Sequence, residues 1–396
     1  MWNLWPLLMQ FRAAAGVTDS HVLSYGLDMT GFSPKAGLSA LLIAVAAGLS
    51  ACGPTPHPRQ PELADLYERA PRGPLPDGVR PLLYKLDLTI DPRENRFGGT
   101  ATIDVEFDQP ARGFWLHGQG LEIRGVTVTG NLLEGEEASW RDVLGSGVAW
   151  INFPRRVDAG VVRVEIEYTT PFDVNLAGLF KVEEQGNAYA LAKSESIQAR
   201  RFMPGFDEPR YKAPFDIVLT VPANDTAISN TPVVSREPVD EGALETWTFE
   251  RTRPLPTYLL SLAVGNFDKV EAEPLAPNDV RSVPIPLTGY TREGKGEEIA
   301  YALDMTEPMV AFFERELQIP YPYKKLDIIA APQWPSGATE LAAAITYRES
   351  RILYGENSGP AARRSLLGIH SHEIAHMWFG DLVTPPWWDD LWLKEA

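Results

Sequence analysis

Hydrophobic and polar residues alternate along most of the chain between about residues 82 and 266. Successive side chains of a β-strand point to opposite faces, so a period of two predicts strands with one buried face. The repeating apolar positions are Tyr84, Leu86, Leu88 and Ile90; Ala101, Ile103, Val105 and Phe107; Val162, Val164, Ile166 and Tyr168; and Phe215, Ile217, Leu219 and Val221. We therefore predict an antiparallel β domain, and we expect most of its aromatic residues to serve its core.

The pattern changes after about residue 268, where strand-like segments give way to helical spacing. Residues 299–317 predict one helix, which Pro308 is expected to kink because proline cannot donate the intrahelical hydrogen bond. Residues 359–380 predict a second helix, with proline at a permitted first-turn position and glycine at its end.

The amino-terminal region reads as a targeting segment. Ala36–Ala51 is an uncharged apolar run, too short to span a bilayer but suited to the core of a signal peptide. The sequence that ends in Cys52 resembles a bacterial lipoprotein box, and Cys52 is the only cysteine, so we expect lipid attachment there. The alternative is a short buried helix with a stray cysteine. Residues 1–28 precede a plausible start at Met29 and are expected to be an upstream extension.

Proline is frequent after this cysteine and predicts a stiff, extended tether. The patterns together predict four parts: 1–51, extension and lipoprotein signal peptide; 52–78, proline-rich tether; 79–267, β domain; and 268–396, a second domain with strands and helices. The expected location is the bacterial cell envelope, lipid-anchored to a membrane and facing the periplasm.

Composition limits the possible partners. With 396 residues, 44% hydrophobic and 22% charged, the chain can bury two sizeable cores. Its net charge of −17 argues against binding nucleic acid and against electrostatic docking on anionic lipid. Nothing in the composition predicts an oligomeric state.

Candidate chemistry gathers near the carboxyl end, in His372-Glu373-Ile374-Ala375-His376. Residues four apart lie one above the other on a helix, so His372 and His376 can bind one metal ion. Glu395, nineteen positions later, would complete a set of three zinc ligands and leave the fourth position open, as in catalytic sites. Glu373 is displaced round the helix and is the candidate general base. His370 should face away from the metal. Serine-elbow, phosphate-loop and zinc-ribbon motifs are absent from the sequence.

The segment that leads to Glu395 starts with the break at Pro385-Pro386. Asp389 or Asp390 is expected to cap the short helix that carries this carboxylate. We expect the Trp387-Trp388 pair to pack beside the zinc helix rather than to contact substrate.

Three stretches resemble the aminopeptidase N family of zinc metallopeptidases: residues 372–395, residues 198–215, and residues 319–327 with 337–340. The resemblance covers approximately residues 78–396. It implies a mixed fold, in which a saddle-like antiparallel β domain precedes the first half of a thermolysin-like α+β catalytic domain. It also implies one Zn²⁺ per chain and peptide substrates.

The resemblance further implies a substrate-binding motif at Gly337-Ala338-Thr339-Glu340-Leu341, where the family usually has Gly-Ala-Met-Glu-Asn. By the same resemblance, Gly337, Ala338 and Glu340 bind substrate, and Glu195 is a second carboxylate for the protonated α-amine. The alternative for each acid is a solvated surface carboxylate. Thr339 and Leu341 depart from the family and are expected to alter the pocket for the first side chain.

Two function classes stay open. The first is a zinc-dependent aminopeptidase that removes amino-terminal residues from peptides, with this chain an amino-terminal fragment of low zinc affinity and little activity. The family's oxyanion-stabilising tyrosine would then lie further along. The second is a non-catalytic envelope module that binds peptides or a partner. A general base at Glu373 favours the first class, because a binding module has no use for one.

Overall fold

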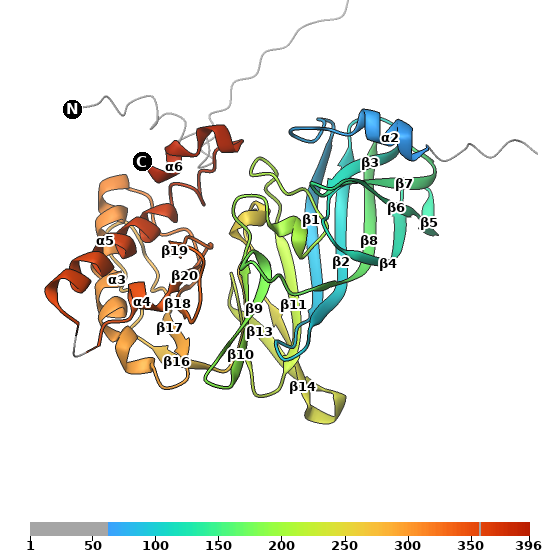
Figure 1. Ribbon diagram of the computed structural model, residues 1–396. Helices are drawn as coiled ribbons and strands as arrows, with labels where there is room; N and C mark the ends of the chain where they lie inside the picture. Colours follow the sequence, from blue (N-terminus) through green and yellow to red (C-terminus); the bar gives the residue numbers. More distant parts are fainter. Residues whose placement is uncertain (1–61, 356–357) are drawn as a thin grey trace, which may run out of the picture. The chain divides into compact units, whose positions relative to one another are not determined.

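The computed structural model describes residues 62–355 and 358–396 (Figure 1). The expected signal peptide, the start at Met29, Cys52 and residues 52–61 of the tether therefore lie outside the described residues. Within the described part of the chain, no helix combines the length and apolar character needed to cross a bilayer.

An eight-stranded sheet forms the body of the β domain (Figure 1). Its order is β13 (Val233–Val239), β14 (Leu244–Phe249), β11 (Phe215–Pro222), β1 (Val79–Thr89), β2 (Arg96–Phe107), β8 (Gly160–Pro171), β4 (Glu122–Gly130) and β5 (Leu133–Glu137). The predicted alternation is confirmed, because the sixteen alternating apolar positions predicted from the sequence, which lie in or next to β1, β2, β8 and β11, are all buried. One pairing corrects the expected antiparallel sheet: β1 runs parallel to β11, a strand from a distant part of the sequence.

Two smaller sheets complete this part of the chain. A three-stranded sheet has the order β3 (Ala111–His117), β7 (Val148–Val157) and β6 (Ser139–Leu144). A four-stranded sheet has the order β12 (Thr226–Ser229), β15 (Leu262–Gly265), β10 (Asn187–Lys193) and β9 (Gly178–Glu184). The aromatic side chains do serve the core, as at Tyr84 and Phe215, whose rings stack with centroids 4.6 Å apart.

The tether prediction is wrong for residues 62–78. Helix α2 (Leu63–Arg69) lies there, and Leu66 and Leu75 are buried in the main hydrophobic core. The Glu208 carboxylate accepts the backbone N–H of Leu75 at 2.5 Å, which fixes this segment to the β domain. The proline content suggested a free spacer, but two apolar anchors and one buried acceptor hold the segment in place.

Glu208 belongs to the 198–215 stretch, which forms a buried polar network. The Arg200 guanidinium donates to the Asp207 carboxylate at 2.9 Å, and Thr257 donates to its other oxygen at 2.7 Å. Arg210 donates to Glu208 at 2.8 Å. These bonds satisfy buried charges inside the β domain. The residues of this stretch that resemble the family therefore stabilise the fold of that domain.

The remaining strands form a five-stranded sheet covered by helices (Figure 1). The strand order is β16 (Phe267–Glu271), β17 (Leu287–Arg292), β18 (Leu326–Ala331), β20 (Ala344–Arg348) and β19 (Ala338–Thr339). The helices are α3 (Ala300–Leu317), α4 (Glu349–Ile352), α5 (Pro360–His376) and α6 (Trp392–Glu395). This arrangement confirms the expected fold class, a mainly β domain followed by part of an α+β domain.

Helix α5 is fixed by one apolar face. Leu366, His370 and Ile374 recur every four residues on that face and are buried. Thr306 of α3 gives its hydroxyl proton to the Ala302 carbonyl, so it accepts from His370 Nε2 at 2.9 Å. His370 Nδ1 accordingly accepts from the Tyr347 hydroxyl at 2.7 Å. His370 thus takes no part in the proposed metal site, as expected, but it is buried rather than solvated, and burial lowers its pKa to about 4.

Two predicted helix boundaries need correction. Helix α5 ends at His376, not near Gly380, because the chain turns back immediately afterwards. Asp381 N–H donates to the His376 carbonyl at 3.1 Å, and Gly380 adopts φ +124°, which few other residues tolerate. Neither Asp389 nor Asp390 caps α6; both lie in a preceding 3₁₀ turn, and the cap position is occupied by Leu391.

A buried ion pair anchors α3 to the loop between β16 and β17. Glu314 is fully buried and accepts from Arg281 at 2.8 Å, from Asn278 at 2.6 Å and from the backbone N–H of Tyr321 at 2.8 Å. Arg281 is only 2% exposed. Removing either partner leaves a buried charge without compensation.

We expect Glu314→Ala to lower the free energy of unfolding by about 3–5 kcal/mol, because it strands the Arg281 cation. Denaturant titration measures this loss. Glu316→Ala is the matched control on the same helix; its carboxylate is 54% exposed and should change stability by less than about 0.5 kcal/mol. Equal losses in the two variants would contradict the anchoring role.

Candidate active site

The structure brings together the three expected ligands, His372, His376 and Glu395. The two Nε2 atoms lie 3.0 Å apart, and a Glu395 oxygen lies 3.4 Å from His372 Nε2 and 3.8 Å from His376 Nε2. Zinc bonds of about 2.0–2.2 Å in tetrahedral geometry separate neighbouring ligand atoms by about 3.3–3.6 Å. The three observed separations straddle that value, so the donor set fits a zinc-sized ion.

The local fold orients these ligands. His376 is 2% exposed, and its Nδ1 lies 2.9 Å from the Phe379 carbonyl. A carbonyl only accepts, so Nδ1 carries the proton and Nε2 keeps the lone pair that a metal needs. The turn that ends α5 supplies this acceptor. His372 lies one helical turn earlier and is partly exposed, which leaves a path to solvent.

Glu373 occupies a different environment from Glu395. Its Oε2 is buried and has no hydrogen-bond partner among the described residues. Burial, followed by the carboxylates of Glu340 and Glu395, raises the pKa of Glu373 to about 9. A hydrogen bond with His372 leads the effects that lower the pKa of Glu395 to about 2. The partnerless oxygen and the surplus of carboxylates both fit a site built to receive a cation.

The two expected amine-binding acids also meet at this site. Glu195 follows β10 and Glu340 follows β19, yet one oxygen from each lies within 4.8 Å of the other and of a Glu395 oxygen. Glu340 is 3% exposed, and both acids bind the Lys394 ammonium. Neither is therefore a solvated surface carboxylate.

Lys394 itself was not anticipated from the sequence. It is adjacent to Glu395 on α6 and packs near Tyr258, whose ring centroid is 5.6 Å from its Nζ. Burial alone would lower the pKa of Lys394, but Glu340 and Glu195 outweigh burial and raise it. The sequence does place a lysine directly before the expected ligand Glu395. Its role could not be recognised there, because the acids that it binds become its neighbours only in the folded chain.

The 337–341 motif forms the edge of the five-stranded sheet. A Cβ on Gly337 would lie 2.8 Å from Ile369 of α5, so this glycine allows the edge to approach the histidine helix closely. Ala338 pairs with Tyr347 of β20. This placement brings Glu340 close to Glu373 and His376. The substrate contacts of Gly337 and Ala338 stay predictions.

The two departures from the family motif lie in the interior. Thr339 is 1% exposed, and its hydroxyl accepts from the Trp334 indole at 3.1 Å. Leu341 is buried in the same apolar cluster as Trp334. Any effect of these substitutions on the first side chain of a substrate must therefore act through the position of Glu340. Trp388 packs edge-on against Tyr258 at 5.1 Å and borders the core of the β domain, so its packing partner differs from the zinc helix that we expected.

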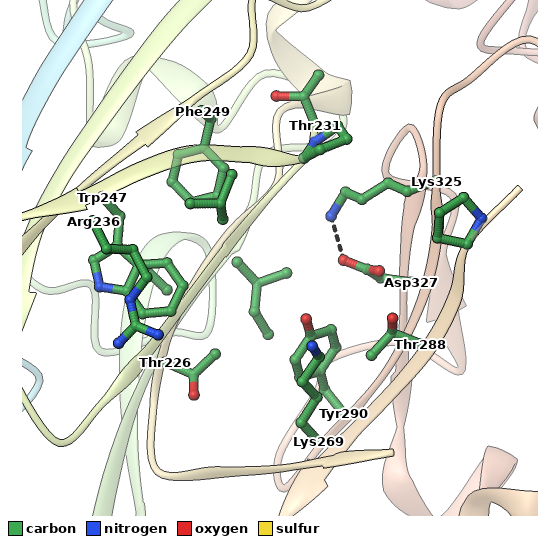
Figure 2. A pocket seen from close by; sticks show the side chains of 15 residues that line it. Thr226, Thr231, Arg236, Trp247, Phe249, Lys269, Thr288, Tyr290, Lys325 and Asp327 are labelled. Carbon is green, nitrogen blue, oxygen red and sulfur yellow. Dashed lines mark hydrogen bonds and ion pairs between the residues drawn. The ribbon is translucent and has the colours of Figure 1, made fainter. Parts of the chain in front are cut away.

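Figure 2 shows a different cavity, of about 410 Å³, lined by residues of the β domain and of the five-stranded sheet. Its cations are Arg236, Lys269 and Lys325, and each has a carboxylate partner: Glu245, Glu271 and Asp327, respectively. These cations are therefore neutralised by their own partners, whereas a buried carboxylate oxygen without a partner lies at the other site, on Glu373.

Comparison with known proteins identifies the family of this chain. Residues 80–259 match the peptidase M1 N-terminal domain, and residues 301–396 match the peptidase family M1 domain. Together these matches cover most of the chain. The protein therefore belongs to peptidase family M1, the aminopeptidase N family of metallopeptidases.

Individual relatives support the same assignment. The chain is 32% identical over 358 residues to the puromycin-sensitive aminopeptidase of Caenorhabditis elegans, covering 88% of this chain and 36% of that protein. It is 30% identical over 338 residues to an aminopeptidase N of Acetobacter pasteurianus, covering 83% of this chain and 91% of that protein. The chain thus spans about a third of the length of the nematode relative.

Proposed function

We propose that the protein is a zinc-dependent aminopeptidase, to which this chain contributes the metal ligands, the general base and the amine-binding acids. One observation carries the proposal: two imidazole nitrogens and the Glu395 carboxylate lie at zinc-ligand separations beside the partnerless oxygen of Glu373. Relatives named as aminopeptidases support the reaction class.

The ligands His372, His376 and Glu395 would hold the zinc ion, which when bound supplies Lewis-acid polarisation of a carbonyl and a lowered pKa for water. Glu373 holds a buried oxygen at this place. Burial favours its protonated form, but a cation bound nearby would favour the ionised form, which would accept the proton of the attacking water. The same oxygen would then return the proton to the leaving amine. The side chain needs no rearrangement, because α5 fixes it one residue from His372.

Glu195 and Glu340 would bind the protonated α-amine of the peptide. Their carboxylates already hold an ammonium group, that of Lys394, in a buried setting. Charge-assisted hydrogen bonds of this kind are short and directional. A peptide held by its amino terminus places its first peptide bond, rather than an internal one, beside the histidines, which would restrict cleavage to the first residue.

The alternative, a non-catalytic envelope module, is less well supported. Such a module could use the acid pair to bind amino termini. It would not require the two imidazoles and the buried base that the structure brings to the same place.

Metal analysis tests the ligand assignment. We expect the complete protein to bind about one zinc per chain and His376→Ala to weaken binding by more than about 100-fold, since loss of an outer-shell partner already weakens a site by 10–100-fold. His57→Ala is the control that removes an imidazole elsewhere in the chain. Equal zinc affinity in wild type and His376→Ala would refute the assignment.

Peptide hydrolysis tests the base. Glu373→Gln should lower kcat by about 10²–10⁴-fold while zinc content stays at the wild-type level, because only proton transfer is lost. The substrate is a short peptide, assayed with a free and with an acetylated amino terminus; only the free form should be cleaved. Glu316→Gln serves as the exposed-acid control. Retained hydrolysis in Glu373→Gln would favour another base.

We also propose that the protein is lipid-anchored at Cys52 in a bacterial cell envelope and faces the periplasm. The apolar run Ala36–Ala51 directly before the only cysteine supports this. Metabolic labelling with an alkyne fatty acid should mark the wild-type protein and not Cys52→Ser. A label that persists in Cys52→Ser would exclude this attachment point.

A further inference from the structure

Lys394 fills the space between the two amine-binding acids. Its Nζ donates to Glu195 Oε1 at 2.7 Å and to Glu340 Oε1, and it forms an ion pair with Glu395 Oε1 at 2.7 Å. The side chain is 1% exposed, so water does not compete for these bonds. Three elements far apart in the sequence supply the partners: the segments after β10 and β19, and α6.

The group held there has the chemistry of a peptide's amino terminus. A lysine ammonium and an α-ammonium each carry one positive charge and three N–H donors. Two carboxylates accept hydrogen bonds from Lys394 and a third forms an ion pair with it, so its charge is balanced where it lies. The acid pair is therefore shaped and charged for a primary ammonium, and in this structure the chain provides that ammonium itself.

The two carboxylates of the pair are already neutralised by lysine cations, so a second cation beside Lys394 would be unfavourable. Lys193 already donates to the other oxygen of Glu195 at 3.0 Å. A substrate ammonium added to Glu195 and Glu340 with Lys394 in place would set like charges within a few ångströms of one another in a buried site, which is unfavourable.

We infer that Lys394 is an internal occupant of the amine subsite, and that a substrate's α-ammonium reaches Glu195 and Glu340 only by displacing it. Lys394 thereby determines how strongly the site binds amino termini. The inference rests on the proposed function, in which the acid pair is the amine subsite. The four-carbon stem of lysine allows the displacement by side-chain rotation, with the α6 backbone unchanged.

The apparent affinity for an amine depends on the fraction of molecules in which Lys394 has left the subsite. Apparent affinity is reduced by that fraction, and an occupant present in about nine molecules of ten weakens binding about tenfold. Removing the occupant restores the lost affinity. Replacing it by another cation does not.

The experiment titrates the complete protein with 3-methylbutylamine, which carries a primary ammonium and no bond to hydrolyse. 3-Methylbutanol is the matched neutral probe. We expect Lys394→Met, which keeps the length of the stem, to bind the amine about tenfold more tightly than wild type. Lys394→Arg, which keeps the charge, should bind it about as weakly as wild type. The alcohol should not distinguish the three proteins.

Two results would overturn the inference. If Lys394→Met binds the amine no more tightly than wild type, Lys394 is a brace for Glu395 and not a competitor. If both variants gain affinity for the amine and the alcohol equally, the gain reflects added space and not charge.

Failure of the proposed function gives a separate signature. Glu340→Gln, made in the Lys394→Met background, removes one acid of the pair. If amine affinity falls, the pair is the amine subsite, and the Lys394 comparison alone decides the inference. If amine affinity is unchanged, the pair does not bind amines, and the proposed function loses its amine subsite whatever Lys394 does.

Discussion

The site depends on balancing negative charge that the fold concentrates in one place. Glu195, Glu340, Glu373 and Glu395 approach one another from four separate segments, and buried like charges repel strongly. Lys394 offsets part of this charge, whereas Glu373 has no partner among the described residues. A fold maintains such a cluster only where the surrounding structure compensates, and it then has a strong demand for a cation.

Helix α5 supplies that compensation because its two faces have different tasks. The face with His370 and Ile374 is buried against α3 and the sheet, and both ring nitrogens of His370 are satisfied there. The other face presents His372 and His376, four residues apart, to the acids. The 3.6-residue period of the helix fixes the angle between these two faces. The contacts of the buried face therefore determine the direction in which His372 and His376 point.

Local periodicity explains which features were predictable from the sequence. The period of two located β1, β2, β8 and β11, and the four-residue spacing located the pair of imidazoles. The parallel pairing of β1 with β11, the docking of residues 62–78 and the end of α5 at His376 depend on contacts with distant segments. No local pattern encodes such contacts. Lys394 belongs to the same group, because its partners lie 54 and 199 positions away.

Adjacency on α6 couples the two halves of the site. Lys394 extends to the acid pair and Glu395 to the imidazoles, and the two side chains also bind each other at 2.7 Å. In the proposed displacement, a cation at Glu195 and Glu340 would leave the Lys394 ammonium with Glu395 alone, and so would alter the balance of charge beside both histidines. Coupling between two binding equilibria is reciprocal. If an amine in the subsite changes the affinity of the ligands for a metal ion, the metal ion changes the affinity for the amine by the same factor. One short helix therefore links recognition of the amino terminus to the place where chemistry would occur.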